Sequence, residues 1–314
     1  MKLRNYFLLI LALVCCADTA RAEQPKMNVV FFLIDDLGWR DLGCNGSDYY
    51  KTPNIDRLAK EGVRFTDAYA ACTVCSPTRA AIMTGKYPAR LLLTQWLPSG
   101  RWSRTGHKMK EGRYISNLPL EEVTIAEALR QHGYKTAFMG KWHLGTETYY
   151  YPEHQGFDVN IAGRDYGAPG SYFFPFTGKW RIPSTGKTLH KKQPLSGKKG
   201  DYLADRLAEE AEGFIRSNAE YPFFLMLSHY AVHTPLQGKP DKVAKYEAVV
   251  WNSCFFRTGL NPYRSNPPSP GDKQKFFCRS LFSHFETKCE NGQARLLLFT
   301  MKRRFLLHYQ ARSF

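Results

Sequence analysis

The sequence predicts an α/β fold in which a central, mostly parallel sheet lies between helices. Three continuous apolar runs, at 28–34, 134–139 and 222–228, are typical of strands buried on both faces. Segments with helical periodicity lie between these runs, and such alternation is typical of a parallel sheet. Polar residues directly follow each run, at the strand ends where open α/β sheets place their ligand sites.

The first apolar run ends in the acidic pair Asp35 and Asp36. Two adjacent carboxylates at the end of a buried strand repel each other and lose hydration unless a cation joins them. Carboxylate oxygens suit a hard cation such as Ca²⁺ or Mg²⁺. We therefore expect Asp35 and Asp36 to bind a divalent metal, and the alternative is a solvated turn or helix cap.

The next segments predict a helix over 53–61 and a short strand over 63–68. Thr52 stands at the N-cap position, proline occupies the first helical position, and Gly62 ends the helix. The helix should turn Ile55, Leu58 and Ala59 inward. These elements are structural in this interpretation.

A second helix is predicted to begin at Cys75 and to end at Gly85. Pro77 fits the first helical turn, so Cys75 stands at the helix mouth, where unpaired N–H groups favour negative charge. Arg79 lies four residues further on and shares a face with Cys75. This arrangement suits an anionic substrate. The alternatives are a buried structural cysteine or a redox pair with Cys72.

Two further helices and two irregular stretches complete the predicted elements. A capping box at Thr124 and Glu127 begins a helix that ends at Gly133, and 201–217 has an amphipathic pattern. We interpret 94–119 as a surface loop. The aromatic-rich stretch 146–200 either forms the wall of a ring-binding pocket or packs as a loop.

The second and third strands also end in candidate functional residues. Lys141 and His143 follow run 134–139, and an extended chain would place both side chains on one side. Lysine supplies a point charge for an anionic oxygen, and histidine supplies a donor or a proton shuttle. His229 and His233 follow run 222–228, and we interpret His229 as structural.

Three phrases in this chain resemble the sulfatases, a family of the alkaline-phosphatase-like superfamily. They are Cys-Ser-Pro-Thr-Arg at 75–79, Gly-Lys-Trp-His-Leu-Gly at 140–145 and His-Thr-Pro at 233–235. The resemblance implies an alkaline-phosphatase-like α/β sandwich and an arylsulfatase-like sulfuric ester hydrolase that acts on an aryl or carbohydrate sulfate. It also implies that a separate formylglycine-generating enzyme oxidises Cys75 to formylglycine, whose hydrate is the nucleophile.

The resemblance also implies the residue roles. The metal ligands would be Asp35, Asp36 and Cys75, and the catalytic residues Cys75, Arg79, Lys141, His143 and His233. In these roles Arg79, Lys141 and His143 bind the sulfate group and His233 donates to the ester oxygen. The alternatives are a phosphatase or phosphodiesterase of the same superfamily and a non-catalytic fragment that binds sulfated glycans.

Residues 1–22 are typical of a secretory signal. Lys2 and Arg4 precede a short apolar run, and Ala20-Arg21-Ala22 is a small-x-small cleavage site. We therefore expect an exported protein in the periplasm, outside the cell or in the secretory lumen, without stable membrane insertion. The chain has 8 cysteines, and their spacing assigns no disulfide.

The formal net charge of +16 is concentrated near the C-terminus. Residues 249–314 hold eleven Lys or Arg and three Asp or Glu, and no nucleic-acid motif accompanies them, so we expect no nucleic-acid partner. The resemblance covers about 28–248, so we interpret 23–248 as the N-terminal part of a sulfatase catalytic domain.

Residues 249–314 show no helical or strand period. We interpret them as an aberrant basic tail outside the sulfatase sequence, of the kind that a reading-frame shift produces. A sulfatase domain truncated in this way would leave a sheet edge exposed and metal ligands missing. The expectation is a poorly soluble chain with little turnover.

Overall fold

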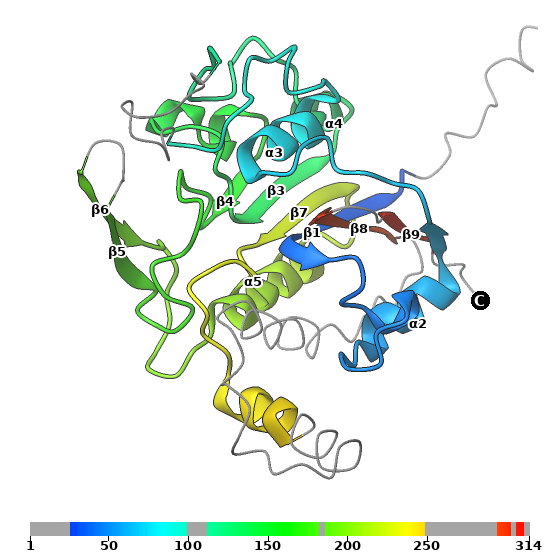
Figure 1. The fold of residues 1–314 in the computed structure, drawn as a ribbon. Coiled ribbons are helices and arrows are strands. Elements are labelled where there is room, and N and C mark those ends of the chain that lie inside the picture. Colours follow the sequence, from blue (N-terminus) through cyan, green and yellow to red (C-terminus); the bar gives the residue numbers. More distant parts are fainter. Residues whose placement is uncertain (1–25, 99–111, 182–185, 249–293, 303–305, 311–314) are drawn as a thin grey trace, which may run out of the picture.

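The computed structural model describes residues 26–98, 112–181, 186–248, 294–302 and 306–310, so the predicted signal at 1–22 lies outside the described residues. Its main feature is a seven-stranded sheet with the order β2-β9-β8-β1-β7-β3-β4, as Figure 1 shows. Its strands are β1 (Asn28–Gly38), β2 (Val63–Phe65), β3 (Lys135–Gly140), β4 (Val159–Ile161), β7 (Phe223–His229), β8 (Ala294–Lys302) and β9 (Leu306–Gln310). The predicted mixed α/β class with a central parallel sheet is confirmed.

The three predicted central strands lie side by side and run parallel. Val29 is paired with Phe224 in the β1–β7 ladder, and Thr136 is paired with the same Phe224 in the β3–β7 ladder. Strand β1 continues four residues beyond the predicted end and becomes irregular between Ile34 and Gly38. Because the three strands share one direction, their carboxyl ends lie at the same edge of the sheet.

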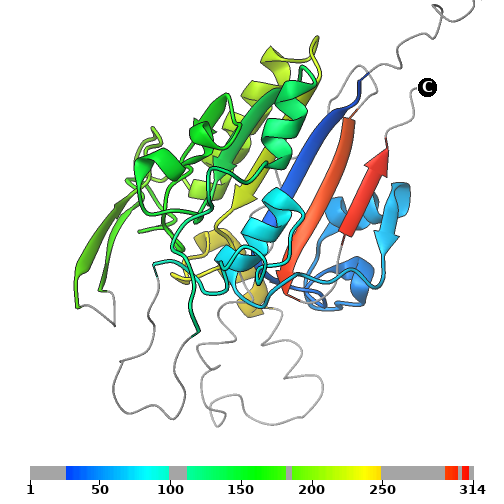
Figure 2. The ribbon, with the colours of Figure 1, turned by 90° about the horizontal axis from the view of Figure 1, so that it is seen from above.

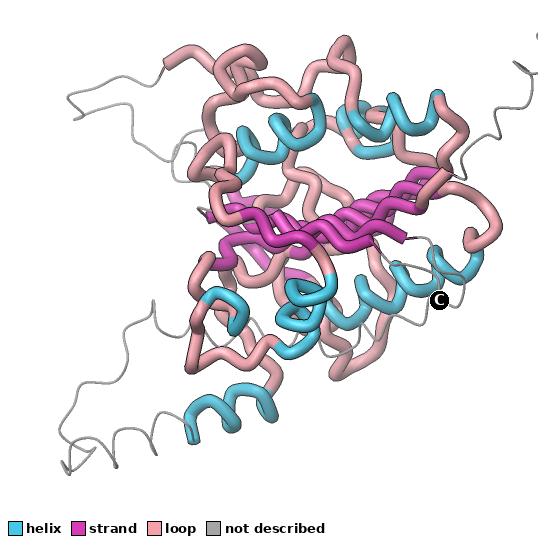
Figure 3. Tube along the Cα trace, turned by 90° about the vertical axis from the view of Figure 1, so that its right-hand side faces the viewer, coloured by secondary structure: helices cyan, strands magenta, loops and turns pink. Residues whose placement is uncertain are grey.

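Helices cover both faces of the sheet, as Figure 3 shows. On one face α3 (Cys75–Thr84) and α4 (Ile125–Gln131) pack against Phe31 and Leu33 of β1. On the other face α2 (Pro53–Glu61) and α5 (Leu203–Ser217) pack against Phe32 and Ile34. The strict alternation of facing along β1 explains why its whole run is apolar.

The helix ends follow the predicted signals closely. Thr124 and Glu127 form both bonds of the capping box at the start of α4. Gly85 ends α3 in the left-handed conformation with φ 68°, which glycine adopts without steric cost. At α2 the outcome differs, because the Thr52 hydroxyl makes no cap bond and instead accepts from the Gly43 N–H at 2.8 Å.

Two strands follow residue 249, so the expectation of no strand period there was wrong for 294–302 and 306–310. Strand β8 runs parallel to β1, and β9 joins β8 to β2 in antiparallel ladders. Figure 2 shows β8 directly beside β1. The run Leu296-Leu297-Leu298-Phe299 is continuous rather than alternating in sequence. The division of the chain at residue 248 itself stays a prediction.

A two-stranded hairpin stands apart from the central sheet in Figure 1. It consists of β5 (Thr177–Arg181) and β6 (Thr188–Lys192), whose antiparallel ladder pairs Trp180 with Leu189. Short 3-10 turns occur at η1 (Gly43–Asn45), η2 (Thr148–Tyr150) and η3 (Pro152–His154), and residues 240–248 form a further helical segment. No helix within the described ranges combines the length and apolarity needed to cross a membrane.

Candidate active site

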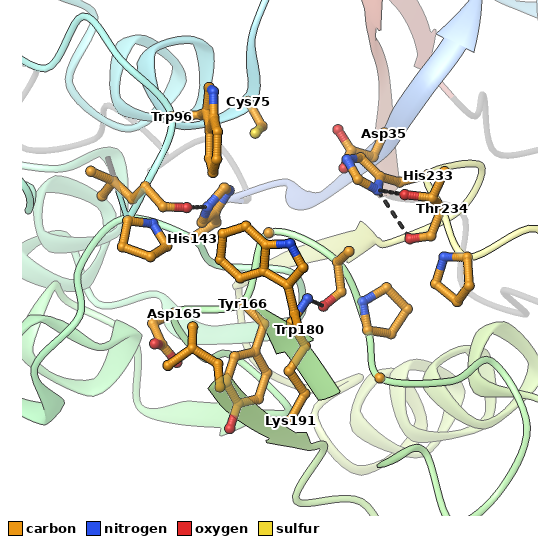
Figure 4. Close-up of a pocket in the computed structure, with 18 of the residues that line it drawn as sticks. Asp35, Cys75, Trp96, His143, Asp165, Tyr166, Trp180, Lys191, His233 and Thr234 are labelled. Atoms are coloured by element: carbon orange, nitrogen blue, oxygen red, sulfur yellow. Dashed lines mark hydrogen bonds between the residues drawn. The ribbon is translucent and has the colours of Figure 1, made fainter. Parts of the chain in front are cut away.

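A cavity of about 770 Å³ opens at the carboxyl ends of β1 and β7, beside the N-terminus of α3. Five of the predicted site residues line it, namely Asp35, Asp36, Cys75, His143 and His233. Figure 4 shows Cys75 facing this space from α3, with Asp35 and His233 beside it and His143 between Trp96 and Trp180. The cavity therefore brings together side chains from four segments that are distant in the sequence.

Beneath the cavity, Lys141 and Arg79 surround the Asp35 carboxylate. The Lys141 ammonium donates to Asp35 Oδ2, and Arg79 Nη2 lies 3.9 Å from Asp35 Oδ1. All three side chains are buried, and the two cations do not line the cavity itself. Burial raises the pKa of Asp35, but the charges of Lys141 and Arg79 outweigh it and hold that pKa below its ordinary value.

Ser228 joins this network from the end of β7. Arg79 Nη1 donates to Ser228 Oγ at 2.6 Å and also to the Lys141 carbonyl, and Ser228 Oγ donates to the same carbonyl at 2.9 Å. Gly140 permits the close approach, because a Cβ there would lie 2.0 Å from the Ser228 carbonyl oxygen. Sequence analysis missed Ser228, although a hydroxyl inside an apolar strand is the signal that could have found it.

His143 is buried, and its Nε2–H donates to the Leu97 carbonyl. Its Nδ1 has no hydrogen-bond partner among the described residues. Burial and the charge of Lys141 lower the pKa of His143 to about 3, so the imidazole is neutral at physiological pH and Nδ1 is available as a hydrogen-bond acceptor. The expected extended chain is wrong here, because His143 has a left-handed φ of 60°.

His233 lies at the rim and is partly exposed. Its Nδ1 donates to the Thr234 carbonyl at 3.0 Å, and its Nε2 lies 3.9 Å from Asp36 Oδ2. His229, in contrast, does not line the cavity. Its ring is buried 5.0 Å from the Phe32 ring, and burial lowers the pKa of His229 to about 3. These contacts agree with the structural interpretation of His229.

The acidic pair offers oxygen donors of the kind that a hard cation prefers, but too few of them. Asp35 and Asp36 lie together at the end of β1, and Asp35 is already paired with Lys141. Within the described residues no group of three or more His, Cys, Asp or Glu is placed to hold a metal ion. Ca²⁺ takes about 6–8 oxygen ligands, so the two carboxylates fit the ion in type, and the described part of the chain supplies only some of the ligands needed.

The described cysteines are free thiols. Cys44, Cys72 and Cys75 are each partly exposed and form no disulfide. Burial raises the pKa of Cys44 to about 11, with the charge of Asp56 acting in the same direction, so its thiol is a poor nucleophile. Cys75 is the one of these three that lines the cavity.

The aromatic stretch 146–200 is divided between the core and the cavity wall, and ring binding by the wall stays a prediction. Tyr172 and Phe176 are buried in the core, whereas Tyr166 and Trp180 line the cavity. Trp96, from the predicted surface loop, also lines it, and its ring centroid lies 6.0 Å from that of Trp180. The remaining residues of that loop at 99–111 lie outside the described residues.

Comparison with known proteins gives consistent matches. The profile of the Sulfatase family matches residues 27–253. Arylsulfatase G of Mus musculus is 35% identical over an alignment of 255 residues that covers 73% of this chain and 45% of that protein. The chain thus spans less than half the length of this relative.

Two solved structures are also similar at 26% identity. One is a crystal structure of Ps i-CgsB in complex with k-i-k-neocarrahexaose, with a TM-score of 0.61 over 88% of this chain and 58% of that one. The other is a protein in complex with its substrate D-glucosamine-2-N,6-O-disulfate, with a TM-score of 0.52 over 72% of this chain and 38% of that one. With the family profile covering most of the chain and the cysteine cavity at the strand ends, this chain belongs to the sulfatase family.

Proposed function

We propose that the chain is a sulfuric ester hydrolase that uses a formylglycine made from Cys75 by a formylglycine-generating enzyme. The observation that carries this proposal is the position of Cys75, at the first residue of α3 in the wall of the cavity. Arg79 lies close enough to Cys75 for the two side chains to interact electrostatically. Lys141 adds a second cation beneath the cavity. An anionic sulfate ester is the substrate that such a site attracts.

Formylglycine, once formed, supplies a hydrated aldehyde whose hydroxyl oxygen attacks sulfur. The chain's own residues then handle charge and protons. Arg79 and Lys141 together carry one more positive charge than Asp35 supplies negative charge, and from beneath the cavity this excess offsets the negative charge on the sulfate oxygens. His233, at the rim, gives a proton to the departing ester oxygen. Nδ1 of His143, which carries no hydrogen bond from the described residues, then takes the proton of the second hydroxyl, and sulfate leaves as the aldehyde re-forms.

We propose Ca²⁺, with Mg²⁺ as the alternative, as the ion that this family site would hold, with Asp35, Asp36 and the group formed from Cys75 as ligands. Such an ion supplies electrophilic polarisation of a sulfate oxygen. We expect slow turnover, because the described residues offer the ion only two carboxylates and Lys141 already occupies one of them. Export through a signal at 1–22 belongs to the same proposal, and its support is the charged start, the apolar run and the cleavage site in that segment.

The test is the intact mass of the Cys75 peptide together with sulfate release. The chain is produced with a formylglycine-generating enzyme, and we expect the mass loss of thiol-to-aldehyde conversion at Cys75. Sulfate release from an aryl sulfate should exceed background and fall to background in Cys75→Ala. Cys72→Ala is the matched control and should keep its activity. An unmodified Cys75, or release that persists in Cys75→Ala, would overturn the proposal.

A further inference from the structure

The hairpin β5–β6 contributes a buried lysine, Lys191, to the cavity. This residue is not among the predicted catalytic residues. Leu189 and Lys191 alternate with exposed neighbours along β6, and Trp180 is paired with Leu189 across the hairpin. These three side chains all line the cavity, and we call them the hairpin wall. Figure 4 shows Trp180 and Lys191 on the side of the cavity opposite Cys75.

Lys191 is only 8% exposed, yet it has no carboxylate partner within 4.0 Å among the described residues. Its Nζ donates to the Ala168 carbonyl at 3.0 Å and lies 5.4 Å from the centroid of the Trp180 ring. An ammonium group has donors to spare beyond one such bond. A carbonyl and an aromatic face offset only part of the cost of burying a cation.

The charges around the cavity favour an anion at Lys191. The positive charge of Lys141 repels that of Lys191. Asp35 balances the charge of Lys141, whereas no carboxylate forms an ion pair with Lys191 among the described residues. Asp165 also lines the cavity and attracts Lys191, but it forms no ion pair with it. An anionic group of a ligand would supply the missing counter-charge and accept the remaining N–H bonds.

We propose that Lys191 forms an anion subsite for a second negatively charged group, a sulfate or a carboxylate, on a sugar whose reacting sulfate ester lies at Cys75. Trp180 lies between the two positions and Trp96 lies beside Cys75, and both offer apolar faces to the sugar ring. The inference rests on the proposed function for the reacting end, but Lys191 selects among substrates and takes no part in the chemistry.

The test is a binding comparison in a Cys75→Ala background, where no turnover occurs. Isothermal titration is carried out with D-glucosamine-2-N,6-O-disulfate, N-acetyl-D-glucosamine 6-sulfate and a monosulfated uronic acid. We expect the disulfated sugar, the sulfated uronic acid or both to bind about tenfold more tightly than the monosulfated sugar, as a charge-assisted bond would give. The two doubly charged probes distinguish a sulfate from a carboxylate as the second group.

Lys191→Met and Lys191→Gln should both remove this preference and leave binding of the monosulfated sugar within about twofold, since no charge-assisted bond to that sugar is lost. Lys191→Arg should keep the preference because it keeps the charge. Lys192→Met is the matched control, because Lys192 is exposed on the same strand. The subsite would be overturned if Lys191→Met lowered the affinity for all probes equally. It would also be overturned if the parent showed no preference or bound none of the probes. Failure of aldehyde formation at Cys75 would instead count against the proposed function alone.

Discussion

The floor and the hairpin wall of the cavity differ in how their charges are compensated. The floor, which consists of Asp35, Arg79, Lys141 and Ser228, is a closed network in which each cation faces an oxygen of the chain. The hairpin wall carries Lys191, for which the described residues provide one carbonyl and no carboxylate partner. Compensated charges hold a structure together, whereas an uncompensated buried charge is available to a ligand.

The largest expected effect is the loss of stability when Asp35, the only carboxylate of the floor, is replaced. Asp35→Asn leaves Lys141 and Arg79 buried without their anion, and removing one partner of a buried pair costs about 3–5 kcal/mol. The free energy of unfolding in urea should fall by that amount. Asp36→Asn is the control and should cost far less, because that side chain is about a quarter exposed. A loss below about 1 kcal/mol in Asp35→Asn would show that the floor is not a stabilising network.

A smaller effect is expected at Ser228, which links Arg79 to the Lys141 carbonyl. Ser228→Ala removes the acceptor of a 2.6 Å bond from a buried guanidinium, and such bonds contribute about 1.5–3 kcal/mol. Urea unfolding measures the loss. Ser116→Ala is the control, since its hydroxyl is exposed and bonds only weakly at 3.5 Å. If both variants unfold alike, the floor does not depend on its hydroxyl.

The smallest expected effect is a pH dependence of ligand binding at Lys191. Burial lowers the pKa of Lys191 to about 8, the charge of Lys141 acts in the same direction, and Asp165 opposes both. Lys191 is therefore charged below about pH 8 and loses its proton above it. The preference for doubly charged sugars should be present at pH 7 and should weaken as the pH rises through about 8.

Titrations at a series of pH values in the Cys75→Ala background would measure this change. Lys191→Arg should keep the preference throughout that range, because arginine stays charged. A preference that does not change between neutral and alkaline pH in the parent would contradict the assigned charge state of Lys191.

The elements whose signals are local could be predicted from the sequence. Apolar runs identified β1, β3 and β7, and the capping box identified the start of α4. Strand β8 was missed because its apolar run is short and lies among basic residues. In the structure this run pairs with β1. Pairing over long sequence distances is a tertiary effect that local patterns do not carry.

The same distinction applies to the site. Asp35 and His143 lie shortly after predicted strands, Cys75 begins a predicted helix, and all three line the cavity. Ser228 and Lys191 were missed, because their importance lies in the side chains that face them and not in their neighbours along the chain. A buried hydroxyl or ammonium becomes recognisable only when its partners are known.

The pairing of β1 also has a consequence for how the polypeptide acquires its structure. Val29 meets Phe224 on one side and Arg295 on the other, so the first strand to leave the ribosome must wait for partners synthesised much later. Contacts between such remote segments are slow to form, and an unpaired apolar strand is prone to self-association in the meantime. Chaperone assistance during synthesis should therefore raise the yield of native protein.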